Sequence, residues 1–154
     1  MSGIDAVIGD YTGLQRTVLE YGRVVENLVD AAKEPGFGVD GWAPLGDLVA
    51  VDEFVRVGNF KEVMNWQEYI SFLTNWAASA EWGCSFKRIS QVGEVVFLEL
   101  EERSKVGTFE SVVNSMSVYE FTADGRIRHI DVYLQMELPS PELLAGYDGV
   151  EIAQ

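Results

Sequence analysis

A chain of 154 residues is long enough for one domain with a substantial core but short for two. Its 11 basic and 25 acidic side chains give a formal net charge of −14, which argues against nucleic acid or an anionic membrane as a partner. Its hydrophobic content of 47% indicates a globular protein, and no apolar run approaches the roughly 20 residues of a membrane-spanning helix. One cysteine excludes an internal disulfide, and the N-terminus lacks the basic region of a secretory signal, so we expect a cytoplasmic protein.

The first half of the chain predicts two helices around one strand. Thr12 followed by Gln15 has the spacing of a capping box, and the apolar stripe that begins there continues to Ala32. Residues 1–10 are expected to be a lead-in, and residues 35–46 an ordered loop rich in turn formers. Residues 48–57 alternate as a strand does. A second helix is predicted to begin at Asn65 and to end before Gly83.

The second half predicts four long strands. Short turns separate the segments 84–92, 94–106, 108–122 and 126–138, and hairpin-length turns force neighbouring strands to run antiparallel. An acidic tail follows at 139–154, with a possible short helix near 141–147. We therefore predict a single α+β domain with its core in residues 10–138, in which the helices pack on a strongly curved antiparallel sheet and leave a conical pocket.

The last predicted hairpin carries the first candidate site. It turns at Asp124-Gly125, and the alternation of its second strand puts His129, Asp131 and Tyr133 on one face. If this face lines the pocket, His129 and Asp131 are candidates for the general acid and base, with pKa values shifted by burial. If it faces solvent or a partner copy, they have no such role. The alternation leaves both orientations open, because Ile127 shares the His129 face.

The other candidate residues lie on the remaining elements. Asp52 and Arg56 share one face of the first strand and are catalytic candidates, unless they form a surface ion pair. The acidic and basic residues at 99, 101 and 103 have the same two interpretations. Residues that could bind a substrate, or simply fill the core, are Tyr21, Trp66, Tyr69, Asn114, Met116 and Tyr133. One histidine and one cysteine argue against a transition-metal site, and we find no phosphate-binding glycine loop.

Three segments of this sequence resemble a known superfamily. They are residues 51–57, the helix that contains Trp66, and above all residues 119–133, where the matching positions of the final hairpin are Phe121, Gly125, Arg126, Ile127 and Tyr133. Over residues 10–138 the chain resembles the nuclear transport factor 2-like superfamily, also called the cystatin-like cone fold. It looks closest to the SnoaL-like and ketosteroid-isomerase-like branches.

The resemblance implies a function in outline. It points to a cofactor-independent isomerase, dehydratase or cyclase that acts by general acid and base catalysis on a hydrophobic polyketide-, terpenoid- or steroid-like molecule, in a homodimer. The alternatives are a non-catalytic binding or dimerisation module and an epoxide hydrolase. Related limonene epoxide hydrolases carry an aspartate immediately before the last-strand tyrosine, where this chain has Val132, and an Arg-x-Asp on the central strand, where it has Glu99-Leu-Glu101. Both departures weaken the hydrolase alternative.

Overall fold

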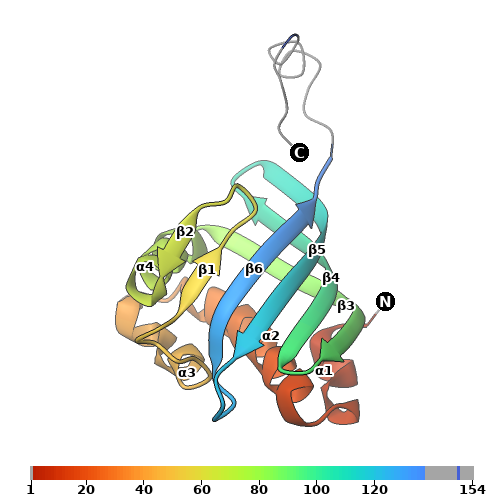
Figure 1. Ribbon diagram of the computed structural model, residues 1–154. Helices are drawn as coiled ribbons and strands as arrows, with labels where there is room; N and C mark the ends of the chain where they lie inside the picture. The colour runs from red at the N-terminus through yellow and green to blue at the C-terminus, as the bar shows by residue number, and fades with distance from the viewer. Residues whose placement is uncertain (1, 138–148, 150–154) are drawn as a thin grey trace.

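The computed structural model describes residues 2–137 and 149, and shows helices gathered behind one face of a curved sheet (Figure 1). The helices are α1 (Ile4–Val7), the 3-10 helix η1 (Ile8–Asp10), α2 (Gly13–Ala31), the 3-10 helix η2 (Val39–Trp42), α3 (Ala43–Gly46) and α4 (Trp66–Ala77). The strands are β1 (Val55–Val57), β2 (Val63–Asn65), β3 (Ala80–Val92), β4 (Val95–Val106), β5 (Phe109–Phe121) and β6 (Ile127–Gln135). The predicted α+β class is confirmed.

The sheet has the strand order β2-β1-β6-β5-β4-β3. Strands β3 to β6 form the predicted antiparallel meander, and its three turns contain Gly93, Gly107 and Gly125, all with positive φ. Strand β1 runs parallel to β6, with Arg56 opposite Ile130, so the sheet is mixed rather than purely antiparallel as predicted. This pairing places Arg56 beside a strand that lies far along the chain.

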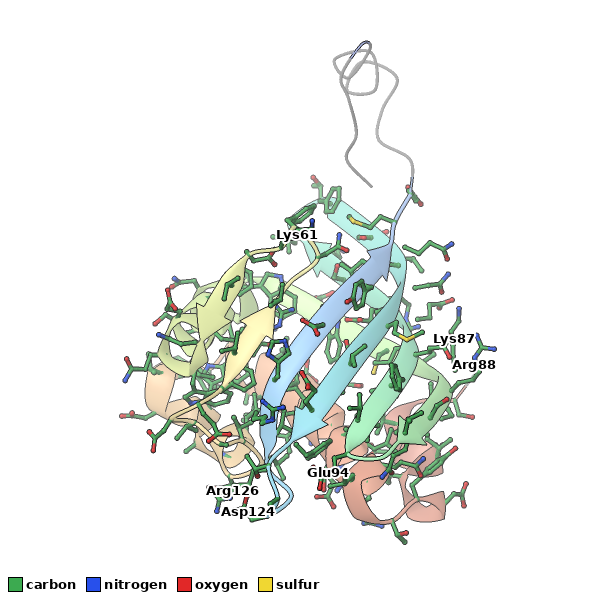
Figure 2. All side chains as sticks on the ribbon, viewed as in Figure 1. Lys61, Lys87, Arg88, Glu94, Asp124 and Arg126 are labelled. Carbon is green, nitrogen blue, oxygen red and sulfur yellow. The ribbon has the colours of Figure 1, made fainter. Side chains whose placement is uncertain are left out.

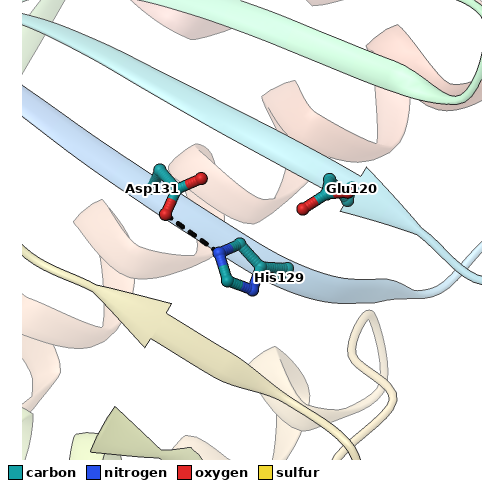
Figure 3. Close-up of side chains that lie close together, drawn as sticks. All are labelled: Glu120, His129 and Asp131. Carbon is teal, nitrogen blue, oxygen red and sulfur yellow. Dashed lines mark hydrogen bonds and ion pairs between the residues drawn. The ribbon is translucent and has the colours of Figure 1, made fainter. Parts of the chain in front are cut away.

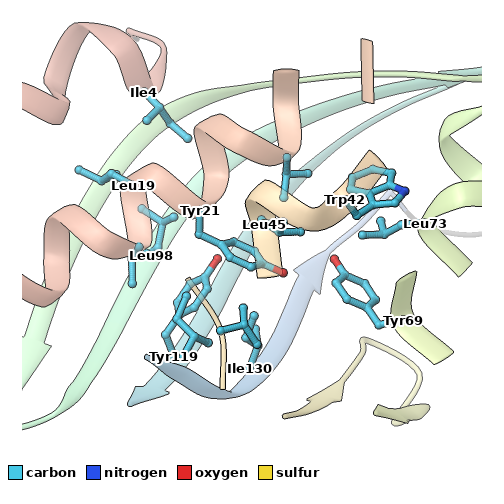
Figure 4. Packing of buried hydrophobic residues seen from close by; sticks show 14 of the residues in the cluster. Ile4, Leu19, Tyr21, Trp42, Leu45, Tyr69, Leu73, Leu98, Tyr119 and Ile130 are labelled. Atoms are coloured by element: carbon cyan, nitrogen blue, oxygen red, sulfur yellow. The ribbon is translucent and has the colours of Figure 1, made fainter. Parts of the chain in front are cut away.

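Helix α2 lies across what we call the inner face of the sheet, and the opposite face, turned away from the helices, is the outer face (Figure 1). Its buried stripe includes Val18, Tyr21, Val25 and Val29, which pack with the inward side chains of the strands (Figure 4). A Cβ at Gly22 would stand 2.7 Å from the side chain of Ile4, so glycine permits α1 to pack closely on α2. The predicted apolar stripe of this helix is confirmed.

The two predicted helix starts have different outcomes. At α4, Asn65 Oδ1 accepts a hydrogen bond of 2.9 Å from the Glu68 amide, and Glu68 Oε1 accepts one of 3.0 Å from the Asn65 amide. The predicted capping box is therefore formed. Thr12 is the N-cap of α2, but its side chain makes no capping hydrogen bond, so the box predicted there is not formed.

Several predicted boundaries are wrong. Of the strand expected at 48–57, only the last three residues pair as β1, because residues 51–53 form a turn. Before this turn, Val49 makes a single bridge to Ile127. Strand β2 was not predicted. Helix α4 ends at Ala77 rather than before Gly83, and the inward residues Ala80, Trp82 and Cys84 already belong to β3.

The segments expected to be irregular contain short helices. In the predicted lead-in, α1 and η1 bury Ile4 and Ile8 against the core. In the predicted loop, η2 and α3 bury Trp42, whose indole N–H donates a 3.0 Å hydrogen bond to Thr74. The predicted acidic tail and its possible helix near 141–147 lie outside the described residues.

A β-bulge in the last hairpin decides which side chains face inward. Glu120 pairs with His129 and Phe121 pairs with Ile127, so Arg128 is an extra residue on β6. Ile127 and Ile130 are therefore both buried although they are three positions apart. Beyond the bulge, Ile130, Val132 and Leu134 face inward, and the residues between them face outward.

Charged side chains occupy the turns and one edge of the sheet (Figure 2). Lys61 lies in the β1–β2 loop, and Asp124 and Arg126 in the β5–β6 turn, while Lys87 and Arg88 lie on the edge strand β3. Charges on an edge strand discourage pairing with another sheet. Within the described residues, no helix is long and apolar enough to cross a membrane.

Candidate functional site

An inner chamber of about 160 Å³ lies between α2 and the inner face of the sheet. Most of its wall is apolar. The polar side chains that line it come from α2, β1, α4, β4 and β5, and are Tyr21, Arg56, Tyr69, Glu102, Ser117 and Tyr119. Five separate elements thus bring functional groups to one space.

The chamber opens into a wider cavity of about 440 Å³, which we call the outer bowl. Like the chamber, it lies on the inner face of the sheet, on the side of the helices. The residues that line both spaces, and so form the passage between them, include Arg56, Tyr69, Trp82 and Glu102. Phe60 and Phe109 line the bowl and are 79% and 69% exposed. An apolar rim of this kind suits a ligand that enters with a hydrophobic part.

Tyr21 is the chamber-lining residue whose buried hydroxyl lacks a hydrogen-bond partner among the described residues. The residue is 4% exposed, and its hydroxyl has no partner within hydrogen-bond distance among the described residues; the Tyr69 hydroxyl is near enough only to contribute to its raised pKa. Its ring packs edge-on against Tyr119 at 5.8 Å between centroids, and its hydroxyl points toward that of Tyr69 (Figure 4). Burial raises the pKa of Tyr21 and of Tyr119. Both therefore remain neutral hydrogen-bond donors across the physiological pH range.

Arg56 supplies the positive charge of the passage. Its guanidinium carbon lies 4.7 Å from the centre of the Tyr69 ring, and Nη1 is 4.0 Å from Glu62. Burial disfavours the charged guanidinium, but Tyr69, Tyr21 and Glu62 favour it more, so the pKa of Arg56 is raised. With its side chain only 18% exposed, Arg56 is a fixed cation next to the chamber.

Glu102 is the carboxylate of the chamber, and the sequence analysis missed it. It lies on β4 and accepts a 2.9 Å hydrogen bond from the Trp82 indole N–H on β3. A signal was present, because Val96, Leu98 and Leu100 show the alternation of a buried face and Glu102 is the next position on it. The two acidic residues that were candidates from the sequence, Glu99 and Glu101, face the opposite side of the sheet.

His129 and Asp131 lie on the outer face, opposite the chamber (Figure 3). His129 Nε2 is 2.9 Å from Asp131 Oδ1, and the two side chains are 25% and 31% exposed. Their neighbours in β6 that line the chamber are Ile130 and Val132. A catalytic role in the pocket required these two residues to face inward. The structure does not place them there, since the bulge turns them outward.

Most other candidates also lie away from the chamber. Asp52 is exposed in a turn, and Trp66 packs edge-on against Phe54 at 5.2 Å. On the outer face, Asn114 accepts a hydrogen bond from Lys87 and donates one to Gln135. Met116 pairs there with Tyr133, which is 60% exposed. Of the sequence-predicted residues, the structure brings only Tyr21, Arg56 and Tyr69 together around the chamber.

The remaining ionisable candidates, Glu99, Glu101 and Cys84, form ion pairs or hydrogen bonds with neighbouring side chains away from the chamber. Glu99 and Glu101 form outer-face ion pairs with Arg88 at 2.7 Å and with Arg103 at 3.1 Å, as the ion-pair interpretation expected. The buried Cys84 thiol donates a 3.3 Å hydrogen bond to Glu26, and burial raises the pKa of Cys84. A thiol in this state is a poor nucleophile.

Comparison with known proteins shows the fold. No protein-family model matches the sequence, and neither does any curated protein. Among solved structures, the chain is similar to the pinacolase BvnE from Penicillium brevicompactum, with 12% identity, coverage of 79% of this chain and 85% of that one, and a TM-score of 0.63. It is also similar to an epoxide hydrolase of the LEH-like type from M. tuberculosis, with 18% identity, coverage of 75% and 83%, and a TM-score of 0.55.

A third similar structure comes from Jannaschia sp. CCS1 and is provisionally described as a SnoaL-like polyketide cyclase. Its identity is 10%, the coverage is 89% of this chain and 94% of that one, and the TM-score is 0.55. At such identities the likeness concerns the fold and not the activity. The chain has the nuclear transport factor 2-like cone fold that its sequence resembles.

Proposed function

We propose that this protein is an enzyme that moves protons on a small, mainly apolar molecule bearing a carbonyl oxygen, as an isomerase, dehydratase or cyclase does. The observation that carries the proposal is the buried Tyr21 hydroxyl, which has no partner among the described residues and lines the chamber. An unpaired buried donor costs about 1–3 kcal/mol, so a ligand oxygen that accepts a hydrogen bond from this hydroxyl recovers that cost on binding.

The volumes of the chamber and the bowl limit the size of the ligand. A cavity of about 150 Å³ is large enough for benzene, so the chamber of about 160 Å³ accommodates one six-membered ring. The larger remainder of a polyketide- or terpenoid-like molecule would occupy the outer bowl. The fixed charge of Arg56 favours an anionic or oxygen-bearing ligand over an ammonium group.

The lining residues suggest a division of roles. Glu102 is the candidate general base, which would remove a proton from the carbon next to the carbonyl. Tyr21 and Arg56 are the candidates for stabilising the negative charge that then develops on the oxygen. Return of the proton from Glu102 to another carbon would complete an isomerisation. Its transfer instead to a hydroxyl on the β-carbon, which then leaves as water while the C–C double bond forms, would complete a dehydration.

The test follows deuterium exchange at the carbon next to the carbonyl by NMR, with cyclohexanone and 2-cyclohexenone as ring-sized probes in D₂O. We expect the protein to accelerate exchange and Glu102→Gln and Tyr21→Phe to reduce it by about 100-fold. Glu101→Gln and Tyr133→Phe remove the same groups from the outer face and should leave the rate unchanged. Exchange that survives Glu102→Gln would contradict the role given to this carboxylate.

The alternative is a non-catalytic binding module. It is favoured by the hydrogen bond from Trp82, which holds Glu102 in the chamber wall without any reaction. Probes that shift the NMR signals of chamber residues but show no accelerated exchange would support this alternative. Adding a small epoxide to the same panel tests the hydrolase alternative, for which diol formation is the positive result.

A homodimer is also proposed, through the outer face of the sheet. This face carries a cross-strand pair of apolar side chains, Met116 and Tyr133, and the exposed Val112. Burying such side chains against a second copy would remove apolar surface from water. Sedimentation of the wild type at twice the monomer mass, and of Tyr133→Lys at the monomer mass, is the expected result; a monomeric wild type would overturn it.

A further inference from the structure

We propose that Glu120, His129 and Asp131 form a binding site for a divalent transition-metal ion on the outer face of the sheet, separate from the chamber. This departs from the expectation drawn from one histidine and one cysteine, because two carboxylates complete the donor set. The three side chains come from two neighbouring strands and point to the same side (Figure 3). Glu120 is the direct partner of His129 in the β5–β6 pairing, and Asp131 follows His129 by two positions. Among the described residues, this is the one group of three such side chains that converges.

The distances suit a metal ion. One possible ligand atom from each residue can be chosen so that all three lie within 4.8 Å of one another. Two adjacent ligands at about 2.0–2.1 Å from a metal are separated by about 2.8–3.4 Å in octahedral or tetrahedral geometry. His129 Nε2 and Asp131 Oδ1 are already 2.9 Å apart. A small rotation of the Glu120 side chain would complete the set.

The chemistry of the donors selects the class of ion. One imidazole and two carboxylates are ligands for Zn²⁺ and similar ions, whereas sites for Ca²⁺ and Mg²⁺ use oxygen alone. Three protein ligands leave at least one position for water or another ligand. The formal charge of −14 further favours the approach of a cation.

Two contacts compete with the metal. The 2.9 Å hydrogen bond between His129 Nε2 and Asp131 Oδ1 must give way to the ion, and Glu120 is paired with Arg128. Arg128 Nη2 lies 3.3 Å from Glu120 Oε1, and its side chain is about half exposed. Ion pairs of this exposure contribute at most about 1 kcal/mol, so Glu120 can leave Arg128 at small cost. The strands themselves need no rearrangement, because β5 and β6 already hold the three Cα atoms in register.

The test uses the full chain without a polyhistidine tag, stripped with chelator and titrated with ZnCl₂ in a calorimeter. We expect one Zn²⁺ per chain, and an affinity lower by at least about tenfold in His129→Gln, Asp131→Asn and Glu120→Gln. Glu101→Gln, which removes one charge from the same face, should bind as the wild type does. Because His129 is the sole histidine, selective broadening of its ring signals by Co²⁺ gives a second readout.

The outcomes separate specific from adventitious binding. Equal affinity in His129→Gln and the wild type, or an equal loss in Glu101→Gln, would show attraction to the acidic surface only and overturn the proposal. Absence of Zn²⁺ binding to the wild type would overturn it as well. Unfolding curves of the metal-free variants confirm that each is folded, and the near-isosteric substitutions at these partly exposed positions make folding defects unexpected.

Discussion

Arg56 holds its guanidinium carbon 4.7 Å from the centre of the Tyr69 ring, at the passage between the inner chamber and the outer bowl. Arg56 belongs to β1 and Tyr69 to α4, so this contact joins the sheet to the helix beside it. A cation over an aromatic face gains about 0.5–2 kcal/mol, depending on how far it is removed from water. The ring thereby holds the one positive charge among the chamber-lining residues in a defined place.

The charge of Arg56 should select ligands by sign. We expect the wild type to bind benzoate more tightly than benzylammonium, which has a similar size and the opposite charge. In Arg56→Gln the affinity for benzoate should fall by about 10–100-fold, because a charge-assisted hydrogen bond contributes about 1.5–3 kcal/mol. Calorimetry measures both affinities. Arg128→Gln removes a charge from the outer face and serves as the control, and an undiminished benzoate affinity in Arg56→Gln would exclude this role.

Tyr21→Phe should stabilise the ligand-free protein. The substitution removes a buried hydroxyl that has no partner among the described residues and keeps the ring in its packing. We expect the free energy of unfolding in urea to rise by about 1 kcal/mol. Tyr133→Phe, at an exposed position, should change it little. A loss of stability in Tyr21→Phe would mean that the hydroxyl is satisfied in solution, for example by bound water.

Stability should fall at alkaline pH because of two buried tyrosines. Burial raises the pKa of Tyr21 and Tyr119 above the value of about 10 for an exposed tyrosine. The folded protein then holds these protons more tightly than the unfolded chain does. The resulting stability is fully present below about pH 10 and is lost as the pH rises toward the folded-state values.

Urea unfolding between pH 8 and 11.5 measures this dependence. In the double variant Tyr21→Phe and Tyr119→Phe, the free energy of unfolding should decline less steeply above about pH 10 than in the wild type. Tyr133→Phe is the control and should leave the slope unchanged, since its ring is largely exposed. Equal slopes in the double variant and the wild type would argue against tight retention of the two protons.

The two helix N-caps should contribute unequally to the free energy of unfolding. Asn65→Ala removes a side chain that accepts the Glu68 amide hydrogen bond, so we expect a loss of about 1 kcal/mol in the free energy of unfolding. Thr12→Ala should cost much less, because the Thr12 side chain makes no capping bond. Chemical denaturation of the two variants side by side decides the comparison. A larger loss in Thr12→Ala would reverse the assignment of the caps.

Local patterns in the sequence were sufficient for much of the fold. The 3.6-residue stripe of α2 and the Asn65–Glu68 spacing of α4 depend on neighbours a few residues away, as does the glycine turn of each hairpin. Tyr21 and Tyr69 were predicted from the helix stripes, and Arg56 from the alternation of its strand. These residues line the chamber because their elements pack as such patterns require.

The sequence by itself thus determined the two long helices, the meander and three of the chamber residues, while the tertiary structure decided which face of the sheet is inside. Alternation divides a strand into two faces, but a single extra residue exchanges them, as Arg128 does in the bulge that turns His129 outward. The parallel pairing of β1 with β6 joins segments more than 70 residues apart, at Val55 and His129, and no local pattern encodes such a contact. The place of Glu102 in the chamber, and of Glu120 beside His129, follows from pairing between strands.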